Sequence, residues 1–297
     1  MFYILLVLKF QTASYYGKKY EAVIILLTIL EVIDDKPEKI SDRIRSVFSP
    51  YSVISDVRNS GGVNVLTLKY YLRRGNVQGE NLYKYCIGSS KKILCDKNIS
   101  LKNSDLERFE SNELNEKLLE NFLLDLYSRN DLPEGIKTGF YDPEAEYPYF
   151  AESILQFCSD LTVITQMPKF YEIEAARVLK GTGAVMKVSN SLDSICSCNV
   201  LISPSKLKRP LPTHQNTVIF TVCNPIVHIP GIIINGYDID IPEQYANLKP
   251  ETIETDYFLS GLYSLCFVKE LADIIPYSCH TDIVCFSSDE MIKLISP

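Results

Sequence analysis

The sequence has little of several features on which common protein classes depend. It contains three histidines in 297 residues, and its formal net charge of −7 shows no excess of positive charge. A negative field repels nucleic acid and anionic membrane surfaces, and three histidines leave little material for a histidine-based catalytic triad. We therefore expect no nucleic-acid partner and no membrane partner.

Long hydrophobic runs are also missing. The run Met1–Phe10 is interrupted by Lys9 and has no basic residue before it, so it predicts a first strand rather than a signal peptide. A second apolar run, Ala22–Ile33, contains Glu31 and is shorter than the ~20 residues that cross a bilayer. It predicts a buried helix or strand, and we expect no transmembrane segment.

The cysteines show neither the even count nor the regular spacing of a secreted disulfide framework. There are nine, most of them in apolar segments. Cys196 and Cys198 form a Cys-x-Cys pair that precedes Cys223 and His228, whereas structural zinc sites use pairs separated by two to four residues. Free, buried thiols fit this pattern better. They predict a reducing, cytoplasmic location and no metal site.

A catalytic cysteine is the alternative interpretation near the end of the sequence. Cys279 is followed by His280, and Cys285 lies five residues further on. A reactive thiolate needs an activating neighbour in space, which the order of residues does not supply. We name no catalytic residue.

The chain is long enough for two domains. The first half combines an expected strand at Tyr3–Phe10, a charged helix around Pro37–Phe48 and a strand near Val63–Tyr71. Apolar residues every four positions predict a helix in Asn103–Asn130, begun by a capping box of Ser104 and Glu107. Pro133 and Gly135 follow this helix. We therefore expect a mixed α/β domain over 1–132 and a second domain over 133–297.

Short strands and helices alternate in the second half. Leu161–Thr165 is a β-branched run without polar alternation, as a parallel strand buried on both faces requires. The expected elements are Ile136–Tyr141, Ala184–Val188, Asn199–Ser203 and Thr217–Val222 as strands, with helices in Tyr149–Cys158, Phe170–Lys180, Ser191–Ile195 and Asp256–Asp273. Such alternation predicts right-handed crossovers and a mainly parallel sheet flanked by helices. The fold class is α/β, and no internal repeat indicates a solenoid.

Residues 136–222 resemble the Rossmann-like NAD(P)-binding domains of the shikimate dehydrogenase and glutamyl-tRNA reductase type. In those families a strand ends in a short polar pair, a helix and a Gly-Ala turn follow, and a later strand ends in a loop of small residues. The matching stretches are Thr165–Gln166, Gly183–Ala184 and Asn199–Ser203. The resemblance implies a nucleotide-type fold, and it carries no catalytic residue onto this chain.

The glycine-rich loop of such domains is missing. A dinucleotide site needs glycines after the first strand so that the backbone approaches the pyrophosphate. At that place the sequence has Asp142–Pro148, with three carboxylates that repel phosphate and two prolines that lack N–H donors. We therefore expect that NAD does not bind here in the usual way.

Three loops follow strands whose carboxyl ends are expected at one edge of the sheet. They contain eight candidate ligand-binding residues: Asp142, Glu144, Glu146, Thr165, Gln166, Ser203, Ser205 and Lys206. The carboxylates suit a cation or an amine, and the hydroxyls and the ammonium suit an anion such as phosphate. The alternatives are a helix cap at Asp142 and a solvated basic loop at 206–209.

These features support three hypotheses about function. The first is a small-molecule-binding or regulatory Rossmann-like module with a degenerate dinucleotide loop. The second is an enzyme with an interdomain active site, either a divergent NAD(P)-dependent oxidoreductase or another nucleotide user. The third is an interaction protein that forms a homo-oligomer through its 19 tyrosines and apolar helices. No particular cofactor is indicated.

Overall fold

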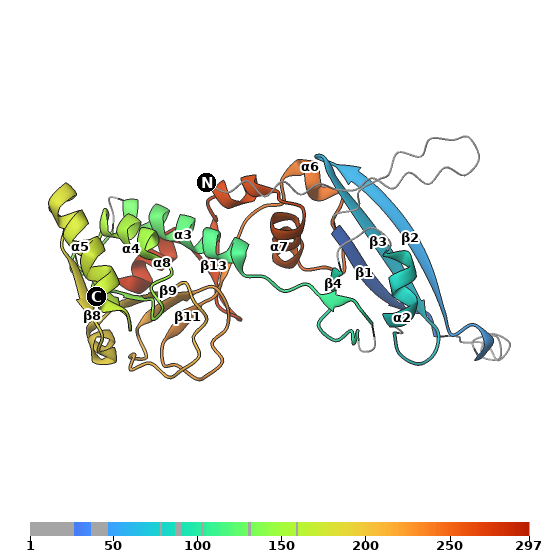
Figure 1. Ribbon diagram of the computed structural model, residues 1–297, viewed down its shortest axis with the longest axis horizontal. Coiled ribbons are helices and arrows are strands. Elements are labelled where there is room, and N and C mark those ends of the chain that lie inside the picture. Colours follow the sequence, from blue (N-terminus) through green and yellow to red (C-terminus); the bar gives the residue numbers. More distant parts are fainter. Residues whose placement is uncertain are drawn as a thin grey trace. The chain divides into compact units, whose positions relative to one another are not determined.

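The computed structural model divides the chain into two compact units, residues 1–108 and 109–297 (Figure 1). The residues that the structure describes are 27–36, 47–77, 79–86, 91–101, 104–129, 132–158 and 160–296. The strand expected at Tyr3–Phe10 and most of the helix expected at Pro37–Phe48 lie outside them. No helix among the described residues is long and apolar enough to span a membrane.

A five-stranded mixed sheet with the order β2-β3-β1-β4-β5 forms the first unit. Its elements are β1 (Leu27–Asp34), β2 (Tyr51–Ser60), β3 (Val63–Leu72), α2 (Gly79–Leu82), η1 (Tyr83–Tyr85), β4 (Lys92–Cys95) and β5 (Glu107–Arg108). β2 and β3 form a hairpin closed by Gly61 and Gly62, whose φ angles of 56° and 77° favour glycine. The other pairs, β1–β3, β1–β4 and β4–β5, are parallel. The apolar run at Ala22–Ile33 thus contributes a buried strand, β1.

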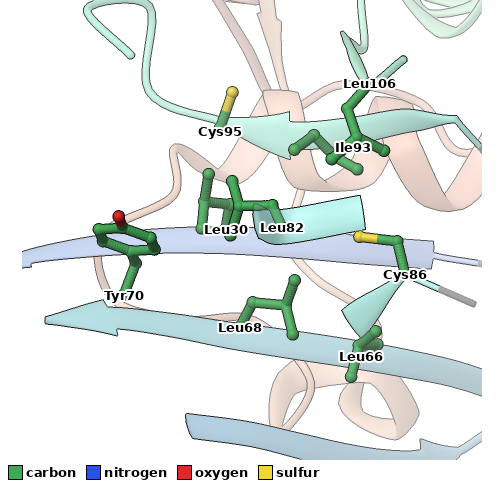
Figure 2. Close-up of a cluster of buried hydrophobic side chains, with 9 residues drawn as sticks. All are labelled: Leu30, Leu66, Leu68, Tyr70, Leu82, Cys86, Ile93, Cys95 and Leu106. Carbon is green, nitrogen blue, oxygen red and sulfur yellow. The ribbon is translucent and has the colours of Figure 1, made fainter. Parts of the chain in front are cut away.

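One apolar cluster of the first unit lies on one face of this sheet. Figure 2 shows nine buried side chains there: Leu30, Leu66, Leu68, Tyr70, Leu82, Cys86, Ile93, Cys95 and Leu106. They come from three neighbouring strands and from the segments that cross over the sheet. The unit therefore has an apolar core of its own.

A parallel six-stranded sheet with the order β11-β10-β9-β6-β7-β8 forms the centre of the second unit. Its strands are β6 (Thr138–Tyr141), β7 (Leu161–Ile164), β8 (Met186–Ser189), β9 (Val200–Ser203), β10 (Val218–Thr221) and β11 (Ile232–Ile234). Numbered from β6, this is the order 3-2-1-4-5-6 of doubly wound dinucleotide-binding folds. The expected parallel α/β sheet is confirmed.

Helices and loops cover the two faces of this sheet. α3 (Glu113–Ser128), α4 (Pro148–Leu155) and α5 (Pro168–Thr182) pack side by side, and Phe140 of β6 meets Phe150 of α4 edge to face. On the other face, η2 (Leu192–Ser197) and the segment after β9 bury Ile195 and Leu207 against the strands. Both faces are buried, which explains strands without polar alternation.

The helix α3 begins later than expected. Its first residue is Glu113. The predicted capping box of Ser104 and Glu107 is wrong, because Glu107 of β5 pairs with Lys92 of β4. The main contacts of α3 are with α4, α7, β12 and η3, all in the second unit. The units therefore divide before α3, whereas the sequence placed the division after it.

The expected helix Asp256–Asp273 is two elements. α7 (Thr255–Leu265) ends one residue before Cys266, and η3 (Lys269–Asp273) follows. Phe267 between them has a φ of 59°, which interrupts a right-handed helix. The prediction of one continuous helix is therefore wrong.

The end of the chain adds a three-stranded antiparallel sheet to the second unit. It consists of β12 (Gly236–Asp238), β13 (Ser278–His280) and β14 (Cys285–Ser287). α6 (Glu243–Ala246) precedes α7, and α8 (Ser288–Ile295) closes the described chain. Ser287 and Glu290 form a capping box at the start of α8.

Candidate functional site

The strand order reverses between β6 and β9, which are neighbours in the sheet. In open α/β sheets ligands bind beyond the carboxyl ends of the strands at this switch point. A pocket of about 430 Å³ lies there, within the range of small-molecule sites. It is lined by Asn112, Glu116, Tyr141, Pro143, Glu144, Glu146, Tyr147, Gln166, Pro204, Ser205, Lys206, Lys208, Arg209 and Val222.

The structure separates the eight candidate residues into two groups. Five line the pocket: Glu144, Glu146, Gln166, Ser205 and Lys206. Three are buried and do not line it: Asp142, Thr165 and Ser203. The three loops expected at one edge of the sheet thus do contribute to one pocket.

The carboxylate of Asp142 binds within its own loop. It accepts hydrogen bonds from the backbone N–H groups of Glu146 at 3.1 Å and Tyr147 at 2.8 Å, just before α4. The hydroxyl of Tyr171, on α5, donates to it at 2.7 Å. Burial, and then the Asp142 charge, raise the pKa of Tyr171 far above its usual range. Asp142 therefore supplies an internal anion where the chain enters α4.

Thr165 and Ser203 have similar local roles. The Thr165 hydroxyl accepts from the N–H of Met167 at 3.1 Å, at the start of α5. The Ser203 hydroxyl donates to the carbonyl of Ser205 at 3.0 Å. These side chains shape the loops after β7 and β9.

Arg209 connects the loops that follow three strands. Its Nε donates to the Tyr141 hydroxyl at the end of β6 at 2.7 Å. With the Gln166 amide oriented to match its neighbours, the amide oxygen accepts from both terminal nitrogens of Arg209 at 3.2 Å. Both partners are neutral, so these contacts position the guanidinium without compensating its charge.

Lys206, Lys208 and Arg209 form the basic wall of the pocket. Both lysines are exposed, and Arg209 is half-buried. Within the described parts of the chain, no ion pair joins any of the three to a carboxylate. The wall therefore presents three positive charges to the pocket.

Acidic residues also line the pocket. Glu144 and Glu146 are exposed in the loop after β6, and Glu116 reaches the pocket from α3. Burial raises the pKa of Glu116, and Glu113 and Glu146 raise it further against a hydrogen bond from Tyr147. Burial and the charge of Glu116 in turn raise the pKa of Tyr147. The pocket is thus lined by groups of both charges.

Several residues of this pocket were not among the candidates from the sequence. Glu116 was missed because α3 was assigned to the first domain, and Tyr141 because it reads as part of a buried strand. Arg209 belongs to a basic run that also fits a solvated loop. Its position four residues after Ser205 in a loop at the switch point is the one signal that could have identified it.

Among the described residues, no group of converging metal-ligand atoms includes a cysteine. Cys196 and Cys198 donate to the backbone carbonyls of Pro212 and Ser194, and all nine cysteines are free. Burial raises the pKa of the Cys279 thiol far above its usual range. Cys279 is therefore not an activated nucleophile.

The strand order and the pocket together define a Rossmann-like unit with a pocket at its switch point. No family model matches the chain, and no curated protein matches it. Among solved structures it is similar to Thermococcus litoralis Δ1-pyrroline-2-carboxylate reductase in complex with NADH and L-proline, at 13% identity over 66% of this chain and 68% of that one, with a TM-score of 0.28.

An archaeal alanine dehydrogenase dimer with bound NAD is similar at 10% identity, over 59% of this chain and 57% of that one, with a TM-score of 0.27. Likenesses of this size carry no argument about function. The strand order of this chain by itself defines the Rossmann-like arrangement.

Proposed function

We propose that the second unit is a small-molecule-binding module, and that its switch-point pocket binds a ligand with an anionic group such as phosphate. The supporting observation is the basic wall of Lys206, Lys208 and Arg209 at the carboxyl end of β9. Guanidinium and ammonium groups are strong donors to phosphate and carboxylate oxygens. Glu144 and Glu146, which also line the pocket, suit amino or hydroxyl groups of the same ligand.

The loop after β6 directs the anion toward the basic wall. In a dinucleotide site the backbone N–H groups after the first strand bind the pyrophosphate. Here the carboxylate of Asp142 accepts two of them, and Pro143 and Pro148 lack an N–H. A phosphate at this loop would also meet the charges of Glu144 and Glu146. The ligand therefore differs in placement from a dinucleotide.

Ligand-induced stabilisation tests this proposal. The full chain is heated in a thermal-shift assay with inorganic phosphate, pyrophosphate, ATP, NAD, NADP or S-adenosylmethionine. A ligand should raise the unfolding free energy by RT ln(1 + L/Kd), where L is its free concentration. At least one anionic compound should give a concentration-dependent shift.

Two charge reversals locate the site. Lys206→Glu should abolish the shift, because it places a fourth acid in the pocket. Lys180→Glu is the matched control, since Lys180 is exposed near the end of α5, away from the carboxyl ends of the strands. Equal shifts in the two variants contradict an anion site at the basic wall. Stabilisation by no compound would favour the interaction-protein hypothesis instead.

An enzyme is the second candidate, and Glu116 is the observation that favours it. Carboxyls with raised pKa in a pocket are candidates for proton transfer, and Glu116 is one. If the protein is an enzyme, the wild-type chain should convert a ligand that stabilises it in the thermal-shift assay. Glu116→Gln should then bind the ligand but not convert it. Binding without turnover in the wild type would reject the enzyme and support a binding module.

A further inference from the structure

A second group of side chains converges outside the pocket. Asp238, Asp256 and His280 each direct one ligand-type atom into a space where all three atoms lie within 4.8 Å of one another. His280 Nε2 lies 3.5 Å from Asp238 Oδ1 and 3.9 Å from Asp256 Oδ2. All three residues are half-buried and belong to the second unit.

The small antiparallel sheet positions two of these residues. Gly236 pairs with His280, and Asp238 pairs with Ser278, in the ladder of β12 and β13. A Cβ atom at Gly236 would clash with the His280 ring, so the imidazole packs directly on the glycine backbone. This packing holds the ring beside Asp238. Asp256 approaches from the first turn of α7.

Hydrogen bonds orient the His280 ring and the Asp238 carboxylate. His280 Nδ1 lies 3.0 Å from the carbonyl of Thr281. Because a carbonyl can only accept, Nδ1 carries the proton in this contact. The Nε2 lone pair of the neutral ring then faces the carboxylates. Asp238 Oδ2 accepts from the Ser278 hydroxyl at 2.6 Å, leaving Oδ1 toward the centre. Such outer hydrogen bonds are typical of metal-ligating histidines and carboxylates.

The two distances from His280 Nε2 are nearer to the spacing of ligands around one metal ion than to the length of a hydrogen bond. Charge-assisted N–H···O bonds are about 2.7–2.9 Å long, shorter than both distances from His280 Nε2. Zinc bonds of about 2.0–2.2 Å to nitrogen and oxygen place tetrahedral ligands about 3.3–3.6 Å apart. The Nε2–Oδ1 distance of 3.5 Å falls in this range, and 3.9 Å lies just above it.

We propose that Asp238, Asp256 and His280 bind one divalent transition-metal ion, with zinc as the probe. Imidazole favours zinc and its neighbours over magnesium and calcium. Three protein ligands leave one tetrahedral position open for water or a bound molecule, as in catalytic rather than structural zinc sites. This site is separate from the switch-point pocket, so neither proposal depends on the other.

Metal content after zinc loading tests the site. The full chain is stripped with a chelator, loaded with Zn²⁺, passed through gel filtration and assayed for metal. One zinc per chain is expected, and cobalt in its place should give the visible absorption of a tetrahedral site. His280→Ala and Asp256→Asn should each weaken zinc binding at least tenfold.

Controls of the same chemistry are available nearby. His228→Ala removes an exposed histidine, and Asp240→Asn removes an exposed carboxylate two residues after Asp238; both should bind zinc like the wild type. Ser278→Ala leaves the ligands intact and removes the hydrogen bond to Asp238. It should weaken binding about 10–100-fold, the usual effect of losing an outer partner.

Two results would overturn the site. One is a zinc-loaded wild type that retains no metal after gel filtration. The other is wild-type affinity in both His280→Ala and Asp256→Asn, which would place the zinc elsewhere. Circular dichroism checks that each variant is folded. If His280→Ala does not fold, Asp256→Asn decides, because Asp256 is partly exposed on the first turn of α7.

Discussion

At the scale of single residues, Asp142 is the most constrained polar group near the pocket. It is fully buried, and its carboxylate accepts from two backbone N–H groups and the Tyr171 hydroxyl. Asp142→Ala leaves these donors without an acceptor, and we expect a loss of about 2–4 kcal/mol in the free energy of unfolding. Urea denaturation followed by circular dichroism measures it.

The matched control for Asp142 is its neighbour Glu144. Glu144 is exposed in the same loop, so Glu144→Ala should change stability by no more than about 0.5 kcal/mol. Equal effects of the two substitutions would mean that the internal anion does not stabilise the turn into α4.

Glu116 gives a prediction about pH. Because burial raises its pKa in the folded chain, the folded state binds the proton more tightly than the unfolded state. The contribution of Glu116 to stability therefore falls as pH rises from the unfolded pKa through the raised folded pKa. Glu116→Gln does not ionise and can still accept from Tyr147.

The variant should therefore gain stability relative to the wild type as pH increases from 4 to 7. Urea denaturation of both chains at several pH values measures the difference. If the difference in unfolding free energy stays constant or shrinks toward pH 7, ionisation of Glu116 in the pocket does not lower stability.

At the scale of elements, α5 contains two glycines with opposite expected effects. Gly181 is inside the helix with an open space around it, and Gly183 caps the helix with a φ of 79°. Gly181→Ala should stabilise the chain by about 0.5–1 kcal/mol, because alanine is the better helix former. Gly183→Ala should destabilise it by about 1 kcal/mol, because it forces a side chain into the left-handed region.

Thermal unfolding of both variants measures the two effects, and each variant is the control for the other. Both glycines follow the helix Phe170–Lys180 expected from the sequence, and only the backbone angle separates their roles. Destabilisation by both substitutions would show that the helix ends at Gly181 in solution.

Elements were predictable where local pattern decides them. The strands β7 and β9 are short apolar runs buried on both faces, a pattern that few other structures produce. Boundaries set by distant pairing were not predictable. Glu107 reads as part of a helix cap, and only the neighbouring strand β4 makes it part of β5. Phe267 interrupts a helix pattern through a backbone angle that no residue type around it signals.

At the scale of the whole molecule, the carboxyl-edge rule located the loops of the pocket from the sequence. The rule needs only alternating strands and helices, and five of the eight candidates line the pocket that the strand order creates. The acidic contribution of α3 could not be found this way, because it depends on which unit α3 packs against. The group of Asp238, Asp256 and His280 joins three distant segments with no short motif.

The division between the units leads to the last prediction. The structure assigns α3 to residues 109–297, where it buries an apolar stripe that includes Leu118, Phe122 and Leu126. Phe122 contacts Phe220 of the large sheet and Tyr237 of the small one. A fragment of residues 109–297 should therefore fold cooperatively, whereas a fragment of residues 133–297 exposes these partners and should not.

Urea denaturation of both fragments, followed by circular dichroism, tests this division. Cooperative unfolding is expected for 109–297 alone, because burial of three large apolar side chains contributes on the order of 5–9 kcal/mol, comparable to the stability of a whole domain. A cooperative transition in 133–297 would place the boundary after α3, where the proline and glycine turn of the sequence suggested it. In that case Glu116 would also lie outside the domain that forms the pocket.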